Sequence, residues 1–119
     1  MQANNRDAAS IWDMVQAIRR IQEFTAGLSF DDYQASILIQ SAVERQLEIL
    51  GEAAARVSET LRQTYPEIHW RRTVGLRNII IHRYDEIQQD IIWNIITTEL
   101  ATLLTQLQPL LPPLPDEEA

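Results

Sequence analysis

Cysteine and lysine are both absent from the 119 residues of this chain. Without cysteine there is no disulfide framework, no thiolate metal site and no cysteine nucleophile. Only three glycines are present, and no Gly-rich loop, which excludes P-loop and Rossmann motifs. No stretch approaches the roughly 18 consecutive apolar residues that cross a bilayer, and the N-terminal MQANNRDAAS has no apolar signal-peptide core. We therefore expect a cytoplasmic protein with no membrane partner.

The remaining composition is that of one soluble helical domain. Hydrophobic residues make up 45% and charged residues 23% of the chain, and the length suits a single compact domain. Apolar residues recur at three- and four-residue steps almost throughout, and no strand-like alternation persists. We predict an all-α fold, an up-and-down four-helix bundle that occupies residues 1–108. Residues 109–119, PLLPPLPDEEA, are predicted to be a Pro-rich acidic tail, extended or disordered.

Four helices are expected from this pattern. They cover about residues 7–26, 30–62, from 69 or 70 to 81 or 82, and from just after Glu86 to about Leu107. Gly27 is well placed to end the first helix. Ser29, followed by two aspartates, is typical of a helix start. Pro66 closes the second helix because it biases Tyr65 away from helical angles.

The second predicted helix carries a heptad-like apolar seam and a glycine. The seam steps by four and three residues through Val43, Leu47, Leu50, Ala54, Val57 and Leu61. Periodicity leaves open whether this seam is core or interface. Gly51 lies inside the same helix, where glycine costs roughly 1 kcal/mol relative to alanine. We therefore expect another helix to approach closely at Gly51.

The chain is acidic overall, but several of its cationic residues lie close together in the sequence. Seventeen Asp and Glu against ten arginines give a net charge of −7. Such a surface repels nucleic acid on average, so RNA binding requires a local patch. Arginine offers a planar fork of donors that suits phosphate, and four of the ten lie within thirteen positions: Arg71, Arg72, Arg77 and Arg83. Arg71, Arg72 and Arg83 are candidate RNA-binding residues, and they could equally be surface charges or contacts to an acidic partner.

Only two histidines are available for acid–base chemistry, and His69, next to Trp70, reads as a surface or capping residue. His82 follows Asn78 by four residues, so both share a helix face and the amide can fix the imidazole tautomer. Arg77 precedes His82 by five residues, about 140° away around a helix. Arg77 and His82 could meet if the helix frays at its end or if a two-fold axis brings a second copy opposite.

Arg77 and His82 together could cleave a phosphodiester without a metal ion. The guanidinium would hold the phosphate and stabilise its developing charge. The imidazole would take a proton from a ribose 2′-OH or give one to the leaving 5′-oxygen. From residue types and spacing alone, the favoured interpretation is structural: Arg77 would pair with a Glu on a neighbouring helix and His82 would cap a helix C-terminus, since such arrangements are common.

The segment RNIIIHRY, residues 77–84, resembles the R-x4-H-x-Y signature of HepT-like toxins of the HEPN superfamily. The similarity extends from Val43 to Ile87 and includes the GEAA, YPEIHW and IIWNII runs. It covers nearly the whole chain except the Pro-rich tail.

The resemblance implies a homodimeric helical ribonuclease whose composite site combines two R-x4-H motifs and cuts RNA without a metal or other cofactor. Arg77 and His82 would be catalytic, and Asn78 would orient them. It also implies a toxin–antitoxin pairing with an MntA-like nucleotidyltransferase. That antitoxin would use ATP and magnesium to AMPylate the motif tyrosine, here Tyr84. The added charge and bulk beside His82 could block the RNA phosphate.

A second interpretation belongs to a different functional class. The chain could be a non-catalytic helical subunit that binds the nucleotide or substrate of a nucleotidyltransferase complex, and its acidic surface fits this slightly better. Such a subunit would not arrest growth when it is expressed. Arg77→Ala and His82→Ala would therefore have no growth arrest to abolish. A purely structural dimerisation module is a third interpretation, but it leaves the clustering of Arg, Asn, His and Tyr unexplained.

Overall fold

The computed structural model describes residues 5–82 and 88–112, and for Ile81 and His82 it describes the backbone only. Every regular element in this part of the chain is helical, which confirms the all-α prediction. The elements are α1 (Asn5–Thr25), α2 (Phe30–Gln34), α3 (Ile37–Arg56), α4 (Glu59–Thr64), α5 (Trp70–His82), α6 (Gln89–Thr98), α7 (Leu100–Leu107) and the 3₁₀ turn η2 (Gln108–Leu110).

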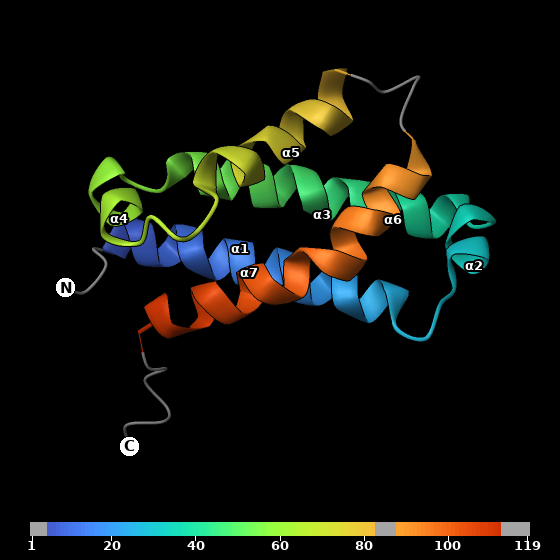
Figure 1. Cartoon of the computed structure of the whole chain (residues 1–119), viewed down its shortest axis with the longest axis horizontal. Helices are drawn as coiled ribbons and strands as arrows, with labels where there is room; N and C mark the ends of the chain where they lie inside the picture. Colours follow the sequence, from blue (N-terminus) through green and yellow to red (C-terminus); the bar gives the residue numbers. More distant parts are fainter. Residues whose placement is uncertain (1–4, 83–87, 113–119) are drawn as a thin grey trace.

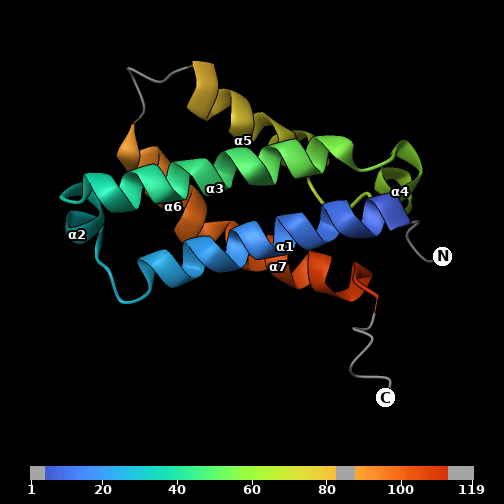
Figure 2. The ribbon, with the colours of Figure 1, turned by 180° about the vertical axis from the view of Figure 1, so that it is seen from behind.

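The long helices form an up-and-down arrangement of four rods. Helices α1 and α3 lie side by side and antiparallel, and α5 runs back along α3 (Figure 1). Helices α6 and α7 follow each other across one face of the α1–α3 pair, and the view from behind shows α1 and α3 in front of them (Figure 2). In both views the C-terminal end of α5 stands away from α3.

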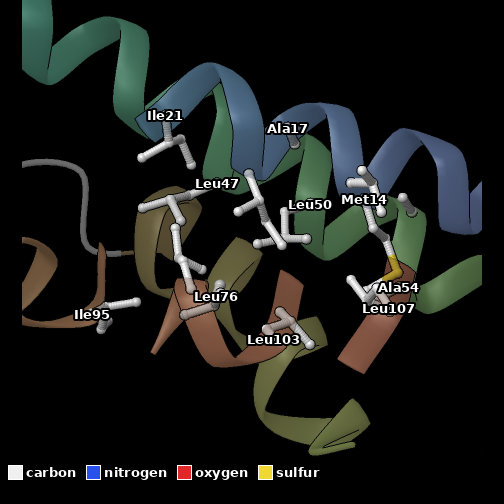
Figure 3. Packing of buried hydrophobic residues seen from close by; sticks show 14 of the residues in the cluster. Met14, Ala17, Ile21, Leu47, Leu50, Ala54, Leu76, Ile95, Leu103 and Leu107 are labelled. Carbon is white, nitrogen blue, oxygen red and sulfur yellow. The ribbon is translucent and has the colours of Figure 1, made fainter. Parts of the chain in front are cut away.

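The apolar core lies between α1, α3, α5 and the α6–α7 rod. Figure 3 shows Ile21 of α1 and Leu47 of α3 at one end of this layer, and Met14 of α1, Ala54 of α3 and Leu107 of α7 at the other. All five side chains are completely buried. The apolar seam of the second predicted helix is therefore core: its members from 43 to 61 are all buried, and they pack within one chain.

The prediction of one long helix over 30–62 is wrong, because the segment is divided into α2, α3 and α4. Ser36 Oγ accepts a hydrogen bond from the Ile39 amide at 3.1 Å and starts α3. Ser58 Oγ accepts one from the Leu61 amide at 3.2 Å and starts α4. Serine side chains satisfy amides that have no partner in the first helical turn. The Arg62 guanidinium donates to the Ala54 carbonyl at the end of α3, at 2.9 Å.

The start of α1 is tied to α4 by a buried carboxylate. Asp7 accepts hydrogen bonds from the Ser58 amide at 2.9 Å and the Ser58 hydroxyl at 2.6 Å. The predicted end of this helix is confirmed, because α1 finishes at Thr25 and Gly27 adopts a φ of +76°. This left-handed backbone carries little penalty in glycine. Ser29 then forms a capping box with Asp32, and its hydrogen bonds lower the pKa of that carboxyl.

The C-terminal rod is also interrupted, since Glu99 separates α6 from α7. At the end of α7, Pro109 and Leu110 continue into the η2 turn, and Leu110 and Leu111 pack against the core. Most of the predicted tail, residues 113–119, lies outside the described residues, so its extended or disordered state stays a prediction. No helix in the described ranges is long and apolar enough to cross a membrane.

Candidate functional site

Helix α5 carries five of the predicted site residues: Arg71 and Arg72 lie at its start, and Arg77, Asn78 and His82 lie in its second half. Arg77 is half-buried and Asn78 is exposed, both in its second half. His82 is the last residue of α5, and its backbone is helical. The predictions for Arg83 and Tyr84 fall outside the described residues. Positions 77 and 82 therefore belong to one helix and differ by about 140° around its axis.

Arg77 is fixed by contact with α3. Its Cβ and backbone amide lie directly against Gly51, so the close helix approach expected at this glycine is confirmed and occurs at a candidate catalytic residue. No salt bridge to Arg77 forms among the residues that the structure describes. The backbone and Cβ of Arg77 are thus fixed by packing against α3. Its guanidinium has no carboxylate partner in the described ranges.

The two arginines at the start of α5 differ in their surroundings. Arg71 is exposed and makes no ion pair within the described part of the chain. Arg72 donates through Nε and Nη2 to the two carboxylate oxygens of Glu99, at 2.5 and 2.6 Å. These hydrogen bonds lower the pKa of the Glu99 carboxyl and raise the pKa of Arg72. The positive charge of Arg72 is therefore largely compensated, whereas that of Arg71 has no compensating carboxylate within the described ranges.

A pocket of about 450 Å³ lies between α5 and the α6–α7 rod. Its lining combines buried apolar side chains with polar side chains, the Arg72–Glu99 pair among them. Its lining residues are His69, Arg72, Thr73, Leu76, Ile95, Thr98, Glu99, Leu100, Thr102, Leu103 and Gln106. No pattern in the sequence indicates this pocket, because its two walls are far apart in the chain. His69 is exposed there, as expected of a surface histidine.

Two consecutive side-chain hydrogen bonds fix the beginning of α6, the helix that follows the motif. The buried Tyr33 hydroxyl donates to Gln89 Oε1 at 2.6 Å, and Gln89 Nε2 donates to Glu44 Oε2 at 2.7 Å. Burial, followed by the charge of Glu44, raises the pKa of Tyr33 above its ordinary value, so the phenol stays protonated and remains a donor. Trp93 packs on the Tyr33 ring, with centroids 5.1 Å apart. This network joins α2, α3 and α6.

Comparison with known proteins identifies the family of this chain. A family model described as "Ribonuclease HepT-like" matches residues 14–110, which includes all described site residues. The chain belongs to the HepT-like ribonuclease family. The resemblance to HepT-like proteins is thereby confirmed, and membership of this family supports endoribonuclease activity.

Two archaeal proteins illustrate the similarity to other HepT-like proteins. The "Probable ribonuclease HepT" of Thermococcus cleftensis is 33% identical over 91 residues, which are 76% of this chain and 83% of that protein. A Methanocaldococcus jannaschii protein named as a candidate RNase, MJ1380, is 30% identical over 100 residues, 84% of this chain and 92% of that protein. No solved structure matches the chain significantly.

Proposed function

We propose that this HepT-like protein is a metal-independent endoribonuclease toxin that cuts RNA at a composite site formed by two copies of the chain. The observation that carries the proposal is the position of the R-x4-H motif within the matched family region, on one ordered helix. Arg77 and His82 are the proposed catalytic residues, and Asn78 supports His82. The helical phase of the two catalytic positions favours a dimer, because residues about 140° apart on one helix do not converge on one phosphate.

In the proposed reaction the RNA supplies its own nucleophile. His82 of one copy accepts the proton of the ribose 2′-OH, and the 2′-oxygen attacks the adjacent phosphorus. Arg77 stabilises the charge that develops on the phosphate oxygens. The bond to the 5′-oxygen breaks, and that oxygen takes a proton from the second copy's imidazolium. The products are a 2′,3′-cyclic phosphate and a 5′-hydroxyl, and no metal ion is consumed or required.

Cleavage of a single-stranded RNA in the presence of EDTA tests this reaction. We expect Arg77→Ala and His82→Ala each to lower kcat/KM by about 100-fold or more, the range for loss of one acid–base or electrostatic group. His69→Ala is the matched control, because it removes the other histidine of the chain and should keep the wild-type rate. Cleavage that stops on chelation, or that survives His82→Ala, would contradict the proposal.

Neutralisation is proposed to occur by AMP transfer to Tyr84, catalysed by an MntA-like nucleotidyltransferase antitoxin with ATP and magnesium. A phosphate-linked adenylate two residues from His82 would bring negative charge to the site that holds the RNA phosphate. Intact-mass measurement before and after incubation with that enzyme is the test. We expect a gain of one or more AMP units that is absent in Tyr84→Phe and retained in Tyr65→Phe. An unchanged mass in wild-type protein rules out this mechanism.

A second candidate function is a non-catalytic subunit that binds the nucleotide or substrate of a nucleotidyltransferase complex. The pocket between α5 and the α6–α7 rod favours it, because about 450 Å³ is a volume suited to a small ligand. The cleavage assay separates the two functions. A subunit that only binds a ligand cleaves no RNA, so Arg77→Ala would leave the result of the assay unchanged.

A further inference from the structure

Helices α3 and α5 touch at a point where a side chain would not fit. A Cβ atom at position 51 would lie 2.8 Å from Arg77 Cβ, 2.9 Å from the Arg77 backbone nitrogen and 3.2 Å from the Val74 carbonyl oxygen. Real Cβ atoms essentially never approach other heavy atoms closer than 3.0 Å. Two of the three neighbouring atoms are backbone, and the third is the first side-chain atom of Arg77. A change of rotamer therefore cannot relieve the contact, and only a shift of α3 and α5 relative to each other can.

The other two glycines show that this requirement is specific. Gly27 is needed for its backbone angle, and a Cβ there would meet nothing within 4 Å. Gly75 lies within α5, and a Cβ on it would also meet nothing within 4 Å. Glycine weakens a helix relative to alanine at both 51 and 75. At Gly51 the steric contact with α5 gives a reason for the glycine, and at Gly75 no such contact exists.

We propose that Gly51 is a positioning residue for Arg77. The absent side chain lets α5 lie against α3 at the level of Arg77, and this contact sets the place from which the guanidinium reaches a phosphate. The inference rests on the proposed function, since it takes Arg77 to be the residue that binds the phosphate.

Gly51→Ala and Gly75→Ala form a matched pair for the test. Both replace a helical glycine by alanine, so both gain the same helix propensity, but only the first adds an atom at the α3–α5 contact. We expect Gly51→Ala to lower kcat for RNA cleavage by about 10- to 100-fold, as small misplacements of a catalytic group do. Gly75→Ala should keep the wild-type kcat. Equal losses in both variants, or no loss in Gly51→Ala, would overturn the proposal.

A double variant distinguishes positioning of Arg77 from general damage. If Gly51 acts through Arg77, then Gly51→Ala combined with Arg77→Ala will cleave no more slowly than Arg77→Ala alone. Additive losses would show that Gly51 acts elsewhere. Repeating the assay in trimethylamine N-oxide, which stabilises folded states by exclusion from the protein surface, addresses unfolding. The kcat of Gly51→Ala should remain low in the osmolyte, and its recovery to the wild-type value would show that loss of stability was the cause.

An NMR measurement keeps this inference separate from the proposed function. The Nε–Hε resonance of Arg77 should shift in Gly51→Ala and stay in place in Gly75→Ala, whether or not the protein cuts RNA. A wild-type protein that cleaves no RNA would therefore contradict the proposed function alone. An Arg77 resonance that does not respond to Gly51→Ala would contradict the positioning role itself.

Discussion

The Arg72–Glu99 contact shows how a single ion pair changes the role expected of a residue. As a sequence position Arg72 is one of four clustered cations, but in the structure its guanidinium binds both oxygens of Glu99. The pair joins the first turn of α5 to the junction of α6 and α7. The Arg72 side chain is 54% exposed and that of Glu99 is 35% exposed, so solvent screens the pair and its contribution is modest.

Glu99→Gln should lower the free energy of unfolding by less than about 1 kcal/mol at pH 7, the range for exposed pairs. Because the folded-state pKa of Glu99 lies below its ordinary value of 4.5, the stabilisation is fully present above that value. It is lost as the pH falls through the lowered pKa and the carboxyl becomes protonated. Urea titrations of both proteins at pH 7 and pH 3 measure this: the difference between them should be largest at pH 7.

Glu23→Gln is the control for this experiment. Glu23 is exposed on α1 and makes no salt bridge within the described part of the chain, so its replacement should change stability little at either pH. A Glu99→Gln effect that persists at pH 3 would mean that packing, and not the ion pair, supports the junction.

At the scale of helices, apolar spacing predicted which residues are buried better than it predicted where helices end. The seam from Val43 to Leu61 is continuous in sequence and buried in the structure, although Val57 lies between two helices and Leu61 in the next one. A short connection keeps the spacing of apolar residues nearly unchanged, so periodicity alone did not show the break. Ser36 and Ser58 were the available signals, since each caps a new helix.

Only those parts of the site that depend on local sequence were predictable. Placing Arg77, Asn78 and His82 on one helix required only the local pattern of residues 70–82. The glycine at 51 predicted a close approach, but not that Arg77 would be the residue approached. The Arg72–Glu99 pair joins positions 27 residues apart in the chain, and the pocket beside it has walls from α5, α6 and α7. Such contacts depend on how helices pack, which spacing along one helix does not encode.

For the whole molecule, the question is how an acidic protein gathers RNA. The net charge of −7 opposes the approach of a polyanion, so binding depends on cations that carry no internal partner. Arg71 meets this condition among the described residues, whereas Arg72 has its charge compensated by Glu99. The two adjacent arginines are alike in the sequence but differ in the structure. Arg71 is expected to contact phosphate, and Arg72 is expected to support the fold.

The salt dependence of RNA binding tests this division in a His82→Ala background, in which cleavage of the RNA is slow. For single strands, the slope of log K against log salt concentration changes by about 0.7 for each phosphate that the protein no longer neutralises. Arg71→Gln should make the slope shallower by about that amount per binding site. The charge-balanced double variant Arg72→Gln/Glu99→Gln should leave the slope unchanged, because it removes one positive and one negative charge that already compensate each other. If the double variant lowers the slope as much as Arg71→Gln does, then RNA displaces Glu99 and Arg72 binds phosphate after all.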